Sequence, residues 1–253
     1  MTGLRPTTEP SASAGGSSVS GTGPALVGLA HGSRHAEGTR SVEQLMALVG
    51  STGGVDARAA FLDLAEPDLQ TTAAALVAAG HRSAVVVPLL FTVAFHATVD
   101  VPEAIAAATA ATGLELVVTD VLGTGEDVLA LVREALVHGG VPDSDDVLLY
   151  AVGSSNAAAN DAVHDLAGRL GRHRAGRARA AFATTDPRPA AVLPELGDSV
   201  ALVPLFLSPG LLLGPLATLA RERGWTLLPP LGDLAAPLVL RRYTTARQRF
   251  GLR

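Results

Sequence analysis

The sequence contains no cysteine, and this absence excludes both disulfide bonds and thiolate metal ligands. Any metal site must therefore use His, Asp or Glu side chains, which are harder ligands. Aromatic residues are also scarce, at 4% of the chain, whereas 48% of the residues are hydrophobic. A core made mainly of Ala, Val and Leu favours buried parallel strands that pack against alanine-rich helices.

Further absences narrow the function. No stretch reaches the roughly 18 apolar residues of a transmembrane helix, and the beginning of the sequence lacks the pattern of a secretory signal. We therefore expect a cytoplasmic protein without a membrane partner. The net charge is -5 without a basic stripe, which argues against a nucleic-acid partner. No GxGxxG or P-loop pattern follows the first strand, which argues against nucleotide binding.

Strand and helix patterns alternate along the first half of the chain. Residues 1–23 are rich in Gly, Ser, Thr and Pro and are predicted to be a disordered N-terminal tail, because they cannot bury enough apolar surface. We expect strands over 25–30, 56–64, 83–90 and 114–119, and helices over 38–49, 67–79, 101–111 and 125–138. This alternation is typical of an α/β fold with a parallel sheet and helices on both faces.

The pattern restarts after a linker at 142–146, which indicates an internal duplication. Four segments match in order with slightly shrinking offsets: 27–34 with 148–156, 59–61 with 180–182, 87–91 with 203–207, and 122–123 with 231–232. We predict two similar lobes, at 24–141 and 142–253, each a parallel sheet flanked by helices. The alternative is two unrelated α/β units that share generic strand chemistry.

Some ionisable residues are present in one half of the duplication only. His31 corresponds to Val152, His96 to Leu212 and Asp63 to Thr184. A structural histidine would tend to persist in both copies, whereas a catalytic set is needed in only one. We therefore expect the active site in the N-terminal lobe and a degenerate site in the C-terminal lobe.

The three ionisable residues follow three strands of one predicted sheet. Ligands of open α/β sheets bind beyond the carboxyl ends of the strands, so His31, Asp63 and His96 can converge on one point. Two imidazoles and a carboxylate suit divalent metals such as Fe(II), Co(II), Ni(II) and Zn(II). Glu66 competes with Asp63 for the carboxylate role. For each histidine taken alone, the alternative is a hydrogen-bonded turn residue, and Asp63 could instead cap a helix.

Three motifs then define a family resemblance. They are His31-Gly32-Ser33-Arg34, Phe61-Leu62-Asp63-Leu64, and Val87-Pro88-Leu89-Leu90-Phe91 followed by Phe95-His96-Ala97-Thr98-Val99-Asp100-Val101-Pro102. In this order and spacing they resemble the sirohydrochlorin chelatase family of class II tetrapyrrole chelatases, over about residues 25–245. The resemblance implies a lyase that inserts Fe(II) or Co(II) into sirohydrochlorin without ATP, in siroheme or cobalamin biosynthesis. The metal is then a substrate, and no cofactor is permanently bound.

The resemblance also implies roles for the site residues. The family has a histidine after the first strand, here His31, and a second one followed by Asp and Pro, here His96 with Asp100 and Pro102. Neutral imidazoles can hold the ion and accept the pyrrole protons. Asp63 stands where Glu is more usual; either Asp63 or Glu66 would favour the imidazolium that forms.

The implied tetrapyrrole substrate carries many carboxylates and a flat ring. Ser33, Arg34 and Arg40 are candidates for polar contacts, although the arginines could equally form an ordinary solvated helix face. Candidate apolar walls are Leu89, Phe91 and Phe95, with Leu207, Leu211 and Leu212 from the second lobe. A two-lobed chain supplies both sides of a cleft, which is compatible with a monomer.

Two alternative functions stay open at this stage. A carrier with the same lobes would bind the metal or the tetrapyrrole without catalysing insertion. A phosphate-handling hydrolase can also have His-Gly after a first strand. Histidine phosphatases need an Arg immediately before that His, however, and Ala30 occupies this position.

Overall fold

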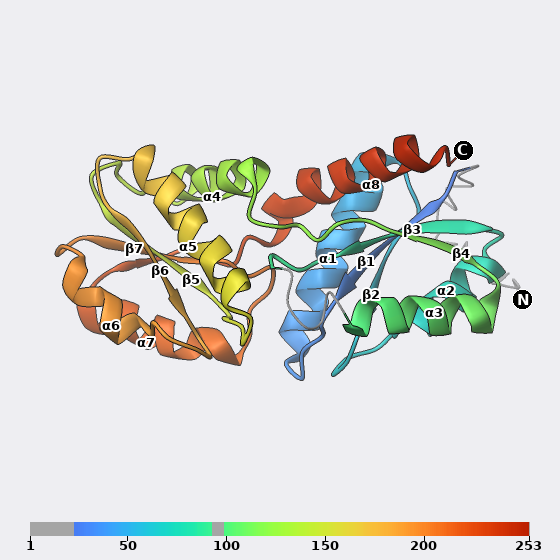
Figure 1. The fold of residues 1–253 in the computed structure, drawn as a ribbon, viewed down its shortest axis with the longest axis horizontal. Coiled ribbons are helices and arrows are strands. Elements are labelled where there is room, and N and C mark those ends of the chain that lie inside the picture. Colours follow the sequence, from blue (N-terminus) through green and yellow to red (C-terminus); the bar gives the residue numbers. More distant parts are fainter. Residues whose placement is uncertain (1–22, 93–98, 253) are drawn as a thin grey trace, which may run out of the picture.

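A computed structural model describes residues 23–92 and 99–252 of the chain. In this range two four-stranded parallel sheets lie side by side (Figure 1), with strand orders β2-β1-β3-β4 and β6-β5-β7-β8. The α/β class and the two-lobed architecture predicted from the sequence are thereby confirmed. The predicted disordered tail, apart from Gly23, lies outside the described residues.

The first half alternates strand and helix. Its elements are β1 (Ala25–Ala30), α1 (Ala36–Gly53), β2 (Ala57–Phe61), α2 (Leu69–Ala78), β3 (Ser83–Pro88), α3 (Val101–Thr112), β4 (Glu115–Val118) and α4 (Glu126–His138). The helix α1 can lie close to β1 because Gly28 has no side chain: a Cβ there would be 2.3 Å from the Met46 Sδ atom.

The second half repeats this order with shorter helices around its outer strands. Its elements are β5 (Asp146–Ala151), α5 (Ala157–Arg172), β6 (Ala178–Phe182), α6 (Pro189–Val192), η2 (Leu193–Glu195), β7 (Val200–Pro204), η3 (Leu211–Leu213), α7 (Gly214–Arg223), β8 (Thr226–Leu227), η4 (Gly232–Ala235) and α8 (Ala236–Phe250). None of the described helices has the length and apolarity that a membrane-spanning helix needs.

Backbone hydrogen bonds repeat between the halves at the strand ends. The Asp63 N–H donates to the His31 carbonyl at 2.9 Å, and the Thr184 N–H donates to the Val152 carbonyl at 2.9 Å. The sequence Ala-Arg-Ala-Ala-Phe forms both β2 and β6. The two lobes therefore share backbone register as well as topology, as expected for an internal duplication.

The last helix of each half packs against the lobe formed mainly by the other half. In Figure 1, α8 lies along α1 beside the first sheet, whereas α4 lies with α5 beside the second. One hydrophobic cluster consequently runs through both lobes and contains residues of α1, α4, α5 and α8. The opposite faces of the two sheets have separate cores, under α2 and α3 in the first lobe and under α6 and α7 in the second.

Arg242 on α8 stabilises this arrangement, in which α4 and α8 each pack against the lobe of the other half. Its guanidinium pairs with Asp127 of α4 at 2.7 Å and donates to the backbone carbonyls of Val121 and Leu122 at 3.3 and 2.6 Å. On the second lobe, Arg169 of α5 pairs with Glu126 at 2.8 Å. The segment at the start of α4 is therefore held from both sides.

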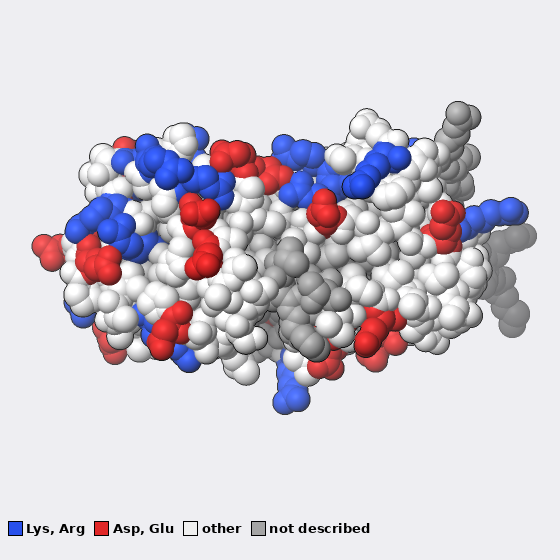
Figure 2. All heavy atoms as spheres, in the orientation of Figure 1, with Lys and Arg blue, Asp and Glu red and all other residues white. Residues whose placement is uncertain are grey.

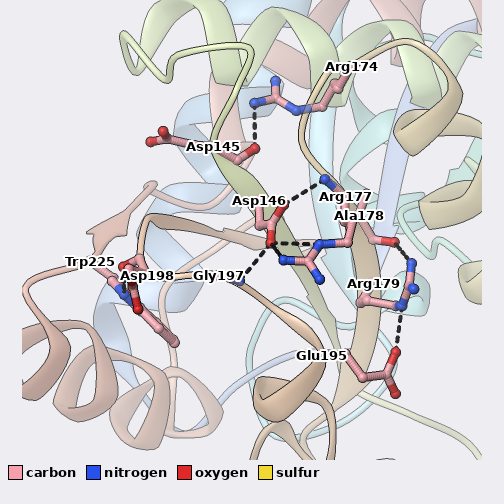
Figure 3. Close-up of polar contacts among 10 residues, drawn as sticks. All are labelled: Asp145, Asp146, Arg174, Arg177, Ala178, Arg179, Glu195, Gly197, Asp198 and Trp225. Carbon is pink, nitrogen blue, oxygen red and sulfur yellow. Dashed lines mark hydrogen bonds and ion pairs between the residues drawn. The ribbon is translucent and has the colours of Figure 1, made fainter.

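The amino ends of the strands carry ion pairs that are partly exposed. In the second lobe the Asp146 carboxylate accepts from the Gly197 N–H at 2.7 Å and the Arg177 N–H at 2.6 Å, and it pairs with the Arg177 guanidinium (Figure 3). Burial alone would raise the pKa of Asp146, but these donors together hold the pKa below its ordinary value.

The first lobe has a different cluster at the corresponding edge. Asp56 pairs with the Arg58 guanidinium at 2.7 Å and contacts the His81 imidazole at 3.1 Å. The hydrogen bond from Arg58 is the main cause that lowers the pKa of Asp56. Both clusters lie at the edge opposite to the strand ends that were expected to carry the active site.

Candidate active site

A pocket of about 610 Å³ lies between the two lobes, where the carboxyl ends of both sheets meet. Its first wall comes from the loop after β1 and the segment after β3, and its second wall comes from the loops after β5 and β7. Its lining includes His31, Ser33, Arg34, Leu89 and Phe91 from the first lobe and Val152, Phe206, Leu207, Leu211 and Leu212 from the second. The pocket thus has the position predicted for a ligand of this fold.

His31 stands at the boundary of this pocket and a second hollow. It follows the last residue of β1, is partly buried, and lines both spaces. Gly32 makes this arrangement possible: its φ is +100°, and a Cβ there would be 1.7 Å from the Asp63 carbonyl oxygen. The loop after β2 therefore packs directly against the loop that carries His31.

The second hollow, of about 460 Å³, is acidic. Besides His31 it is lined by Leu62, Asp63, Asp100, Glu103, Ala104 and Ala107. His31 therefore faces apolar surface on one side and three carboxylates on the other. This arrangement suits a group that contacts both a cation and a flat apolar ligand.

The two carboxylates predicted to assist the histidines lie in different surroundings. Asp63 lines the acidic hollow, and its Oδ1 accepts from the Leu64 N–H at 2.7 Å. Glu66 lines neither space, and its Oε2 accepts from the Asp68 N–H at 3.1 Å. Asp63 is therefore the better placed of the two, since the turn after β2 directs Glu66 toward the start of α2.

The polar residues predicted to bind substrate are also separated. Ser33 and Arg34 line the large pocket, whereas Arg40 does not, and its Nε donates to the Ala36 carbonyl at 3.4 Å. The Ser33 Oγ accepts from the His35 N–H at 3.1 Å, which orders the loop before α1.

Phe91 lines the pocket as predicted for an apolar wall. His96 and Phe95 lie outside the described residues, so their roles stay predictions. Among residues 23–92 and 99–252, no group of three or more His, Asp or Glu side chains is arranged to hold a metal ion. Of the two histidines predicted to be metal ligands, His31 is the one that lies within the described residues.

Exposed apolar side chains complete the second wall. Leu211 is 80% exposed, and Val152, Leu212 and the first-lobe residue Leu64 are exposed by about 40%. In the view of Figure 2, the surface on either side of the junction between the lobes is largely white, that is uncharged, and charged side chains gather along the upper edge. Such a wall can cover one face of a planar ligand.

Sequence reasoning missed several lining residues. Glu103 lies in the first turn of α3 and was not among the predicted site residues, although an acidic residue three positions after Asp100 is a usable signal. Thr39, Asn160, Phe206 and Pro209 also line the large pocket. Their involvement follows from how the lobes face each other, which no local pattern records.

These features define a two-lobed α/β protein with a histidine at the boundary between an apolar pocket and an acidic hollow. Residues 25–138 match the CbiX family. No curated protein sequence matches the chain.

Solved structures match over most of the chain. SirB from Bacillus subtilis with Fe3+ has a TM-score of 0.77 at 24% identity, covering 90% of this chain and 98% of that one. The sirohydrochlorin chelatase SirB from Bacillus subtilis subspecies spizizenii, in complex with cobalt, has a TM-score of 0.72 at 26% identity, covering 90% and 97%. CbiX, described as the terminal enzyme of siroheme biosynthesis in denitrifying bacteria, has a TM-score of 0.69 at 21% identity, covering 88% and 99%, and shows the fold alone.

Residues 25–138 therefore carry a CbiX-family domain, and the chain as a whole is similar to solved sirohydrochlorin chelatases. The resemblance found in the three sequence motifs is thereby confirmed.

Proposed function

We propose that this protein is a sirohydrochlorin chelatase, which inserts Fe(II) or Co(II) into the tetrapyrrole without ATP. The observation that carries the proposal is the position of His31, which faces an apolar pocket between the lobes and an acidic hollow behind it. The CbiX-family domain and the cobalt complex of the relative at 26% identity support it.

The chemistry can be balanced at the tetrapyrrole. Two pyrrole N–H protons leave the macrocycle, the divalent cation loses water ligands, and four nitrogen lone pairs then bind the cation. Neutral imidazole is both a ligand for such cations and a base near neutral pH. We assign to His31 contact with the incoming ion and, once the ion has passed to the ring nitrogens and freed the imidazole lone pair, the acceptance of one of the two pyrrole protons. We predict the same role for His96, which would accept the second pyrrole proton.

The surroundings of His31 favour this proton transfer. The carboxylates of Asp63, Asp100 and Glu103 line the acidic hollow beside it, and negative charge stabilises an imidazolium. The same carboxylates attract a divalent cation electrostatically. We infer that the tetrapyrrole occupies the large pocket and that the cation reaches His31 from the acidic side.

The pocket walls suit a flat amphipathic macrocycle. Phe91 and Leu89 on one side and Phe206, Leu207 and Leu211 on the other offer apolar surface to the ring. Ser33 and Arg34 at the first-lobe edge offer donors to its carboxylates. The second lobe therefore contributes to binding, while the ionisable side chains of the site come from the first.

The test is metal insertion by the purified full chain. The reaction is monitored through the change in the absorption spectrum of sirohydrochlorin after Fe(II), Co(II) or Ni(II) is added. We expect a rate above the uncatalysed reaction that falls in the His31→Ala and His96→Ala variants. Tight tetrapyrrole binding with no acceleration would instead identify a carrier. Equal rates in the wild type and in the double variant would contradict the assignment of both histidines.

A further inference from the structure

Corresponding loops of the two lobes differ in how one backbone N–H is satisfied. In the second lobe, the Asn160 Oδ1 accepts from the Ser154 N–H at 2.9 Å, and the Asn160 Nδ2 donates to the Ser154 carbonyl at 2.8 Å. Asn160 itself lines the pocket between the lobes. The second lobe thus fills a donor position at the pocket wall with its own side chain.

The first lobe has the same loop without this side chain. Ser33 corresponds to Ser154, and the hydroxyl oxygens of both accept from the N–H two residues later, at 3.1 and 3.0 Å. The residue six positions after Ser33 is Thr39, where the second lobe has Asn160. In the described part of the chain, no group accepts a hydrogen bond from the Ser33 N–H.

The first lobe also has a positively charged side chain beside this backbone N–H group, which the second lobe lacks. Arg34 corresponds to Ser155, lines the pocket, and has no ion-pair partner within the described ranges. Ser33, Arg34 and Thr39 all line the same wall of the pocket. Compared with the second lobe, this wall has lost an internal acceptor and gained a positive charge.

We propose that the Asn160 Oδ1 occupies, in the second lobe, the place that one oxygen of a substrate carboxylate occupies in the first, where the carboxylate accepts from the Ser33 N–H and the Arg34 guanidinium. A carboxylate oxygen and a carboxamide oxygen accept hydrogen bonds with similar geometry, and Arg34 makes the carboxylate contact charge-assisted. This inference rests on the proposed function, since it concerns the orientation of an acidic tetrapyrrole in the same pocket.

Thr39 is then a position that determines specificity by leaving space. A threonine side chain is too short to repeat the two contacts of Asn160, so the donor stays available to a ligand. The bound carboxylate anchors one edge of the macrocycle beside the loop that carries His31, which orients the ring for metal insertion.

The test is to install the second-lobe side chain in the first lobe, as Thr39→Asn. We expect the new amide to occupy the Ser33 N–H and to raise the KM for sirohydrochlorin about tenfold, the worth of one hydrogen bond to a charged group. The loss in kcat should be smaller than this and should come from the weaker orientation of the ring. The control is Gln44→Asn, an exposed position on the same helix outside the pocket lining, which should leave both constants unchanged.

A second readout separates this inference from the proposed function. Uroporphyrin carries eight carboxylates, and its binding can be followed by fluorescence quenching without any metal. We expect Thr39→Asn to weaken this binding about tenfold even if the wild-type protein inserts no metal. Turnover by the wild-type protein therefore tests the proposed function. The ratio of the uroporphyrin dissociation constants of Thr39→Asn and wild type tests whether a substrate carboxylate binds at the Ser33 N–H.

A double-variant cycle tests whether the two donors share one carboxylate. Arg34→Ala should also weaken binding, and its effect should be smaller in the Thr39→Asn background, because both changes act on the same contact. Additive effects, or unchanged binding in folded Thr39→Asn protein, would overturn the proposal.

Discussion

The loop after β1 and the loop after β5 have the same backbone hydrogen bonds but present different side chains to one pocket. The first contains His31 and Arg34, and the second contains Val152 and Ser155 at the same positions. Both loops have a glycine with positive φ, Gly32 and Gly153. The comparison teaches that duplication preserved the scaffold of the strand ends, while ionisable chemistry was kept on one side and apolar surface on the other.

The most direct test of the difference between the two loops is to remove His31 from the loop after β1. We expect His31→Ala to lower the rate of metal insertion by about 10²- to 10⁴-fold, the usual contribution of a general base. The matched control is His138→Ala, because His138 is exposed at the end of α4, far from the pocket lining. Initial rates by absorption spectroscopy measure the effect. A similar loss in both variants would mean that the first loop has no special role.

The two glycines sharpen the comparison at the level of packing. A Cβ at Gly32 would meet the Asp63 backbone at 1.7 Å, whereas at Gly153 it would meet the Thr185 side chain at 2.7 Å. Because a side chain can move and a backbone cannot, Gly32→Ala should cost about 2–4 kcal/mol of unfolding free energy and Gly153→Ala about 1–2 kcal/mol.

Urea denaturation gives both values, and Gly54→Ala is the reference. Gly54 has a φ of +60° and open space around its Cβ position, so it reports the conformational cost alone. Equal costs at Gly32 and Gly153 would show that the loop around His31 yields as easily as its counterpart.

The opposite edges of the sheets provide a comparison by charge. Asp146→Asn should cost about 2 kcal/mol at pH 7, because this carboxylate accepts from two backbone N–H groups and a guanidinium. Asp56→Asn should cost less, since in the described part of the chain the Asp56 carboxylate contacts the Arg58 and His81 side chains and no backbone N–H group. Asp145→Asn, at the neighbouring position, is the control.

The sign of the pH dependence follows from the lowered pKa of Asp146. The folded state holds the proton less tightly than the unfolded state, so the stabilisation is present above the ordinary value of 3.8 and is lost as the pH falls through the folded-state value. The difference in stability between the wild type and Asp146→Asn should therefore shrink below about pH 4. A constant difference down to pH 2 would contradict this explanation.

Arg242 tests how firmly the two lobes are joined. Arg242→Ala removes the pair with Asp127 and the contacts with the Val121 and Leu122 carbonyls, and we expect a loss of about 1–2 kcal/mol. Arg241→Ala, an exposed neighbour on α8, should change stability by less than about 0.5 kcal/mol. Calorimetry gives both values; equal stability of the two variants would mean that these contacts do not hold the lobes together.

The fold was predictable where the signal is local. The strand at 25–30 is found with the predicted bounds, and the helices at 101–112 and 126–138 differ from prediction by one residue at one end. The second strand was predicted to cover 56–64, but it ends at Phe61. Leu64 has a φ of 61°, which is outside the range of a strand, so the chain turns away from the sheet before this apolar residue.

The candidate site was predictable only in part. Comparing the halves identified His31 and the loss of its counterpart at Val152, and the structure places both at the pocket. Glu66 was considered because it is near Asp63 in sequence, yet the turn separates the two side chains. The lining by Phe206, Pro209 and Thr39 depends on the orientation of one lobe against the other. Amphipathic patterns indicate which face of a helix is buried but not which sheet buries it.

The exchange of α4 and α8 has a consequence for dissecting the protein. A cut between α4 and β5 would leave the sheet of each fragment without one of its covering helices, α8 or α4, which belongs to the other fragment. We therefore expect neither fragment to fold alone, and the two to recover a native complex when they are produced together. On this expectation the chain resembles two interlocked subunits joined by a tether, and the association of the two halves completes their folding.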